Sequence, residues 1–162
     1  MTSVLVPHAL SSAGQVRHAL VAELRGAGVP EDVVDDAVLV MSELMGNAVR
    51  HGSPLPGGGV RASWWVAGGA VHVEVCDGGP GLDHALPQSV PGSAEGGRGL
   101  PIVDLLTSAW GTTAPSPTGA VGVYAELALP GERAQRLSRG GDASWRPESW
   151  SRRTEVGAGL LA

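Results

Sequence analysis

Apolar side chains recur at helical spacing in three parts of the chain. Residues 11–27 form one apolar face because hydrophobic positions follow each other at four-residue steps, as seen at Val16, Leu20 and Leu24. Residues 29–52 repeat this spacing, with Pro30 and two acidic residues at the start and Gly52 at the end, so a second helix is predicted there. A third, shorter helix is predicted over residues 99–108.

Outside these helices, the chain contains apolar runs of the length of a β-strand. Residues 60–67 and 70–77 are joined by two glycines, which predicts a β-hairpin. Residues 108–114 and 119–129 are predicted as a second strand pair, and residues 3–6 as a short strand. Adjacent strand pairs combined with helices predict an α+β fold, a two-layer α/β sandwich with a mixed, mostly antiparallel sheet and helices on one face.

The distribution of Gly, Pro and Ser divides the chain further. Residues 78–98 are rich in these residue types and lack periodicity, and a loop of this length inside a compact domain is usually functional or disordered. Beyond Pro130 the chain changes to Arg, Gly, Ser and scattered Trp. We therefore expect one domain over residues 1–130, followed by a mostly disordered tail over residues 131–162.

The composition excludes several chemistries. All 11 basic residues are Arg, and the chain contains no Lys. A Walker phosphate loop, a protein-kinase fold with its strand lysine and Schiff-base catalysis all require Lys, so none of them applies. A single cysteine, Cys76, excludes an internal disulfide and a zinc site built from cysteines.

Charge and hydropathy indicate the surroundings in which the protein works. Residues 1–130 hold 12 acidic and 5 basic residues, which argues against a direct nucleic-acid partner. The sequence has no run of about 18 apolar residues, and its first residues lack the basic and apolar regions of a signal peptide. We therefore expect no membrane association and a cytoplasmic location.

The first candidate for chemistry lies on the helix predicted over residues 29–52. Glu43, Asn47 and Arg50 fall on one stripe of that helix, beside its apolar face. A carboxylate, an amide and a guanidinium are thereby aligned. Such a stripe is most often only a solvated polar surface, and this alternative stays open on the stripe alone.

The second candidate follows directly after the strand predicted over residues 70–77. Asp77 is followed by a Gly-Gly-Pro-Gly turn, in which Gly79 and Gly81 would let a ligand approach the backbone. A buried carboxylate there suits the amino group of adenine and would repel the carbonyl of guanine. An ordinary turn is the alternative.

The third candidate is the glycine-rich entry to the helix predicted over residues 99–108. Free N–H groups at a helix N-terminus favour phosphate, and an arginine adds positive charge. A flexible hinge is the alternative. The four residues concerned are Gly97, Arg98, Gly99 and Leu100.

Taken together, the three motifs resemble a known family. Their order, Glu-x-x-x-Asn, Asp-x-Gly-x-Gly and Gly-x-Gly-Leu, is similar to the N, G1 and G2 boxes of the GHKL (Bergerat-fold) histidine kinase-like ATPases. The stretches SELMGNAVRHG, VEVCDGGPGL and GGRGLPIVDLL resemble in particular the anti-sigma-factor serine/threonine-protein kinases of bacteria. The resemblance covers roughly residues 10–129.

The resemblance implies ATP and Mg²⁺ as cofactors and assigns roles to the residues. It implies that Glu43 is the general base, that Asn47 is the Mg²⁺ ligand, and that Asp77 holds adenine, with Gly79 and Gly81 shaping the base site.

The same resemblance implies that the glycine-rich entry closes over the triphosphate. Gly97, Arg98, Gly99 and Leu100 would contact the phosphates, with residues 82–98 as a mobile lid. Arg50 is an additional candidate for a phosphate contact.

Two functions remain open from the sequence. The first is a kinase that binds a sigma factor or a small antagonist protein and phosphorylates Ser or Thr on the antagonist. The second is an ATP-dependent binding module without catalysis, because close relatives tend to carry Lys-Thr-Val-Trp where this chain has Val121-Gly122-Val123-Tyr124. A sensor histidine kinase is disfavoured because no phospho-accepting helix pair is evident. The helix over residues 11–27 is also a candidate homodimer face.

Overall fold

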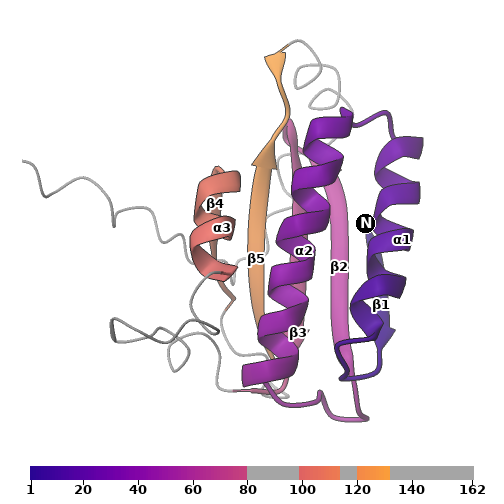
Figure 1. Ribbon diagram of the computed structural model, residues 1–162, viewed down its shortest axis with the longest axis vertical. Helices are drawn as coiled ribbons and strands as arrows, with labels where there is room; N and C mark the ends of the chain where they lie inside the picture. The colour runs from indigo at the N-terminus through magenta and orange to yellow at the C-terminus, as the bar shows by residue number, and fades with distance from the viewer. Residues whose placement is uncertain (80–98, 114–119, 132–162) are drawn as a thin grey trace, which may run out of the picture.

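The computed structural model describes residues 1–79, 99–113 and 120–131. One sheet is covered on one face by helices, which makes a two-layer α+β sandwich (Figure 1). The elements in chain order are β1 (Thr2–Val6), α1 (Ser12–Gly26), α2 (Glu31–His51), β2 (Val60–Ala67), β3 (Ala70–Asp77), α3 (Gly99–Leu106), β4 (Ala109–Thr112) and β5 (Val121–Ala128). The predicted fold class is confirmed.

The sheet has the strand order β1-β2-β3-β5-β4. The four pairings among these strands are all antiparallel, whereas the sequence predicted a mixed, mostly antiparallel sheet. The β2–β3 hairpin is confirmed, with Ala67 opposite Ala70. Gly68 and Gly69 have φ of 58° and 78°, and a two-residue hairpin turn needs this left-handed conformation at both positions.

The core lies between the sheet and the helices. The apolar residues predicted for the face of α1, Val16, Leu20 and Leu24, are at most 1% exposed. Trp64 on β2 is fully buried, and its indole N–H donates to Glu23 Oε2 on α1 at 2.9 Å. This bond attaches the first helix to the sheet and satisfies the one polar group of the indole.

Differences from the predicted boundaries are small. Pro30 has φ −55° and ψ 144° and precedes the helix, because a residue with extended ψ cannot take part in it, so α2 begins at Glu31. The predicted lid (82–98) and residues 132–162 lie outside the described residues. Among the helices that are described, none combines the length and apolar character needed to cross a membrane.

Candidate functional site

The site is centred where β3 ends beneath the C-terminal end of α2. Asp77 is the last residue of β3, is 8% exposed, and lies on the helix-facing side of the sheet. Beyond it, Gly78 N donates to the carbonyl oxygen of Ser53 at 2.8 Å, which joins the end of the strand to the residues that follow α2. A carboxylate is thus held in the interior at the junction of two elements.

The surroundings of Asp77 define its chemistry. Burial raises the pKa of the Asp77 carboxyl above 3.8, while the backbone N–H groups of Gly79 and Ser53 and the nearby His8 act in the opposite direction. Gly79 N donates to Asp77 Oδ1 at 2.6 Å and fixes the orientation of the carboxylate. Each carboxylate oxygen can accept more than one hydrogen bond, so the group keeps acceptor capacity for a ligand donor beside these backbone N–H groups.

Gly52 allows α2 and Asp77 to approach each other closely. A Cβ atom on Gly52 would lie 2.5 Å from both the carbonyl oxygen of Ala48 and Cγ of Asp77. A Cβ on Gly79 would lie 2.8 Å from Asp77 Oδ1 and from Cα of Gly52. That Gly79 lets a ligand approach the backbone stays a prediction; in the structure its missing Cβ makes room for the Asp77 carboxylate and the Gly52 backbone.

We expect Gly52→Ala to destabilise the protein by about 2 kcal/mol or more, because the new Cβ overlaps with backbone and with Asp77, neither of which can move freely. Urea unfolding followed by circular dichroism measures the effect. Gly26→Ala is the matched control, since Gly26 is also a helix-end glycine but a Cβ there meets nothing within 4 Å. Equal stability of the Gly52→Ala protein and the wild type would show that this junction is looser than described.

His8 is a residue of this junction that the sequence analysis did not identify. Its Nε2 lies 3.0 Å from the carbonyl oxygen of Ala48 on α2, and since a carbonyl only accepts, Nε2 carries the proton. The same carbonyl accepts from Gly52 N at 3.0 Å. The loop between β1 and α1 is thereby attached to the end of α2 that covers Asp77. No local pattern indicates this contact, because the two residues are 40 positions apart.

The polar stripe predicted on α2 is present on one continuous helix. Glu43 and Asn47 are half-buried and Arg50 is exposed. Asn47 Nδ2 is buried and has no hydrogen-bond partner among the described residues, which leaves the amide available to a ligand. The Arg50 guanidinium lies over Gly46, where a Cβ would be 3.1 Å from Nη1, so this glycine makes room for the charge beside Asn47.

The site residues are arranged in sequence along α2. With a rise of 1.5 Å per residue, Asn47 lies about 8 Å and Glu43 about 13 Å along the helix axis from Gly52, which contacts Asp77. An extended ligand that starts at Asp77 and follows the helix would meet Asn47 next and Glu43 last. Such a ligand would thus meet first the hydrogen-bond acceptor Asp77, then the amide of Asn47 and finally the carboxylate of Glu43.

The third motif is described only in part. Gly99 and Leu100 begin α3, which packs against α2, and Val103 fixes α3 to the core with 0% exposure. Figure 1 shows α3 beside α2 on the same face of the sheet. Gly81, Gly97 and Arg98 lie outside the described residues. The N-terminus of α3 is therefore placed on the helix layer that carries the α2 stripe.

The last strand places its side chains on two different faces. Val121 is opposite Asp77 on β5 and is 7% exposed, so an apolar side chain is the neighbour of the carboxylate. Gly122 faces the other way, and a Cβ there would lie 2.7 Å from Glu74 Oε1 and 2.9 Å from Cys76 Sγ. The two positions at which relatives tend to carry Lys and Thr are thus directed to opposite sides of the sheet.

The residues of the α2 stripe fit a Mg²⁺ ion. Mg²⁺ prefers oxygen ligands and keeps most of its water, so it needs few protein groups when phosphates are also present. The amide of Asn47 has a carbonyl oxygen of the kind that Mg²⁺ binds, while its unpaired Nδ2 is a donor that suits a phosphate oxygen and not the ion. In the described part of the chain, no three His, Cys, Asp or Glu side chains gather as a metal cluster, so an ion here would depend on the nucleotide for its other ligands.

Comparison with known proteins identifies the family of the chain. Residues 6–120 match the sequence model of the histidine kinase-like ATPase domain, and the chain belongs to this family. The family resemblance inferred from the motifs is thereby confirmed, and membership of an ATPase family indicates ATP as the ligand. A comparison with curated proteins gave no match.

Among solved structures, the chain is similar to the crystal structure of the RsbU and RsbW domains of Rv1364c from Mycobacterium tuberculosis. The TM-score is 0.58 at 22% identity, over 80% of this chain and 33% of that chain. This chain therefore spans about a third of that protein, and the similarity supports the fold.

Proposed function

We propose that this protein is an ATP-dependent protein serine/threonine kinase of the anti-sigma-factor type, which phosphorylates Ser or Thr on a small antagonist protein. One observation carries the proposal. The half-buried Glu43 carboxylate lies on the same stripe of α2 as Asn47, about one turn further from Asp77, and within the described residues it forms no hydrogen bond or ion pair. This position supports Glu43 as the base, beyond the residues that we propose bind the phosphates.

Adenine would be recognised at the end of β3. The Asp77 carboxylate accepts a hydrogen bond from the exocyclic amino group, and Val121 beside it offers an apolar contact to the ring. Guanine presents a carbonyl oxygen at the corresponding position, which would face the carboxylate without a proton between them. The proposed site therefore discriminates ATP from GTP.

The phosphates would extend along α2 from Asp77 towards Glu43. Asn47 would ligate Mg²⁺, which when bound neutralises phosphate charge. Arg50 is close enough to Asn47 on the helix to contribute a second positive group. Gly97, Arg98, Gly99 and Leu100, at the start of α3, would surround the terminal phosphates with backbone N–H groups and a guanidinium.

In the transfer step, Glu43 would take the proton of the acceptor hydroxyl as its oxygen forms a bond to the γ-phosphorus. The bond from that phosphorus to the bridging oxygen breaks, and ADP carries away the electron pair. A positioned base of this kind contributes a factor of about 10²–10⁴.

The proposed partners are a sigma factor, a small protein that antagonises the anti-sigma factor, or both, without direct nucleic-acid contact and without a membrane. The proposed compartment is the cytoplasm, where ATP and a reduced Cys76 thiol are both found. The homodimer expected through residues 11–27 remains a prediction. Sedimentation at high protein concentration tests it, and a monomer there would exclude it.

The proposal is tested by incubating the purified protein with γ-labelled ATP and candidate antagonist proteins. We expect label on a Ser or Thr of one antagonist, and Glu43→Ala should lower the rate of that labelling by about 10²–10⁴-fold. Transfer by the Glu43→Ala protein at the rate of the wild type would remove the proposed mechanism.

A second candidate function is an ATP-dependent binding module that does not transfer phosphate. The position of Val121 favours it, since an apolar side chain next to Asp77 stands where relatives tend to carry Lys. Heat on titration with ATP, combined with nucleotide-dependent partner binding and no labelled product, would identify this function.

A further inference from the structure

The face of the sheet opposite the helices, here called the outer face, carries polar and aromatic side chains. Strand alternation directs every second residue of the central strands to this side. Its central residues are Ser63 and Trp65 on β2, His72, Glu74 and Cys76 on β3, and Gly122, Tyr124 and Glu126 on β5. The hydrophobic core lies on the other side, so in a two-layer sandwich the outer face is the one left to water.

The centre of the outer face is nevertheless buried. Tyr124 and His72 are each 1% exposed, although both stand on the sheet away from the helices. At the β1 edge of the same face, Leu5 is 64% exposed and Arg61 is exposed. The Tyr124 ring lies against Gly111 of β4, where a Cβ would be 3.1 Å from the hydroxyl oxygen and 3.2 Å from the ring. This contact covers one face of the ring, so the burial of Tyr124 requires a further cover.

The chemistry of this buried centre is acidic and aromatic. Glu74 and Glu126 contribute two carboxylates; burial raises the pKa of Glu74, while Cys76 and the nearby Arg61 act in the opposite direction. The ring of Trp65 stacks on His72 with 5.2 Å between the centroids, and His72 Nδ1 lies 3.9 Å from Glu126 Oε1. A cover with guanidinium groups and aromatic rings suits such a surface, because guanidinium pairs with carboxylates and stacks on aromatic faces.

After β5 the described chain ends at the end of the sheet where the β2–β3 turn lies. Leu129 N donates to the carbonyl oxygen of Gly69 at 2.9 Å, which holds the end of β5 beside the β2–β3 turn. Gly131 follows with φ of 53°, in the left-handed region that favours glycine. The described chain ends there, close to the part of the outer face that holds His72 and Glu126.

We propose that the C-terminal segment, residues 132–162, covers the outer face. The segment has 31 residues, enough to extend about 100 Å, whereas an eight-residue strand is about 27 Å long. It holds six arginines against four acidic residues, together with Trp145 and Trp150. Its composition predicts no fold of its own, and such a segment can become ordered along an existing surface. This inference does not depend on the proposed kinase activity.

Tyr124 reports on this cover directly, because it is the only tyrosine of the sequence. In the full-length protein, a tyrosine-selective labelling reagent measures how often Tyr124 becomes accessible. We expect that changing the six arginines of the segment to Gln raises the labelling rate at least about tenfold. These are Arg133, Arg136, Arg139, Arg146, Arg152 and Arg153.

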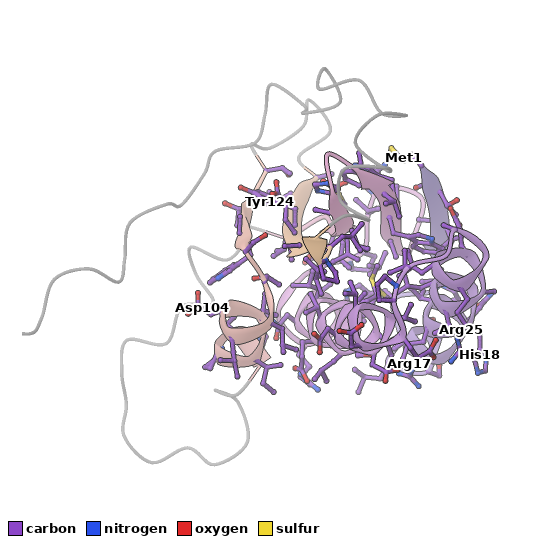
Figure 2. All side chains as sticks on the ribbon, turned by 90° about the horizontal axis from the view of Figure 1, so that it is seen from above. Met1, Arg17, His18, Arg25, Asp104 and Tyr124 are labelled. Atoms are coloured by element: carbon purple, nitrogen blue, oxygen red, sulfur yellow. The ribbon has the colours of Figure 1, made fainter. Side chains whose placement is uncertain are left out.

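The matched control changes Arg17 and Arg25 to Gln on α1. Figure 2 shows both residues on the helix layer, across the molecule from Tyr124. This control should leave the labelling rate unchanged, and circular dichroism should show the same secondary structure in the wild type, the six-arginine variant and the control.

A second full-length variant, with Trp145 and Trp150 changed to Ala, should also increase the labelling rate of Tyr124.

Two results would overturn the proposal. Equal labelling rates in the wild type and both C-terminal variants would show that the segment does not cover Tyr124. A rate that rises when the wild type is diluted, with no effect of the C-terminal changes, would assign the cover to a second copy of the chain.

Discussion

Glu43→Ala is expected to lower phosphotransfer to the antagonist by about 10²–10⁴-fold, because the acceptor hydroxyl loses the group that takes its proton. ATP binding should change little, since Asp77 and Asn47 are untouched and Glu43 forms no bond with either of them in the described part of the chain. Rates of label transfer and calorimetric titration with ATP, made on the same preparations, separate the two effects.

The matched control for this substitution is Asp35→Ala. Asp35 is an exposed carboxylate on α2, eight residues before Glu43, so it reproduces the loss of one negative charge from the same helix. Phosphotransfer by the control should equal that of the wild type. If both variants lose the same amount of activity, the effect comes from the charge of the helix and Glu43 is not the base.

Asp77→Asn is expected to weaken ATP binding on the order of 100-fold. Gly79 N holds the Oδ1 position at 2.6 Å, so an amide at residue 77 keeps its oxygen there and presents its NH₂ group to the ligand. The adenine amino group would then face a donor instead of an acceptor. A lost hydrogen bond to a charged group costs about 1.5–3 kcal/mol, and about 2.7 kcal/mol corresponds to 100-fold in Kd.

The same substitution predicts a change in how stability depends on pH. The pKa of Asp77 is raised in the folded protein, so the native state binds this proton more readily than the unfolded state. Stability without ligand therefore falls as the pH rises from 3.8 through the pKa of the folded protein, and Asp77→Asn removes that contribution. Urea unfolding of the ligand-free proteins across this pH range measures it, with Asp35→Asn as the control that keeps the wild-type dependence.

Much of the fold was predictable because it follows from local patterns. The β2–β3 hairpin follows from two glycines between apolar runs, since both turn positions require positive φ. The apolar faces of α1 and α2 follow from their spacing, and Gly52 was predicted as the end of the second helix. The polar stripe that holds Glu43 and Asn47 is likewise a property of a single helix.

The parts that escaped prediction depend on contacts between distant segments. The sequence marks Gly52 as a helix end, but only the fold shows that its missing Cβ accommodates Asp77, 25 positions later. The bond from His8 to the carbonyl of Ala48 has no local signal, because the loop after β1 reaches α2 only when the sheet is assembled. Strand alternation directs Cys76 away from Asp77, but alternation alone does not show that the centre of this outer face is buried.

Calorimetric titration with ATP and with GTP, each in the presence of Mg²⁺, tests most directly whether Asp77, the α2 stripe and the start of α3 form one adenine-nucleotide site. The predicted result is saturable heat with ATP and none with GTP at the same concentrations, because the Asp77 carboxylate accepts from the amino group of adenine and repels the carbonyl of guanine. No heat with ATP, or equal binding of both nucleotides, would contradict the assignment of this site.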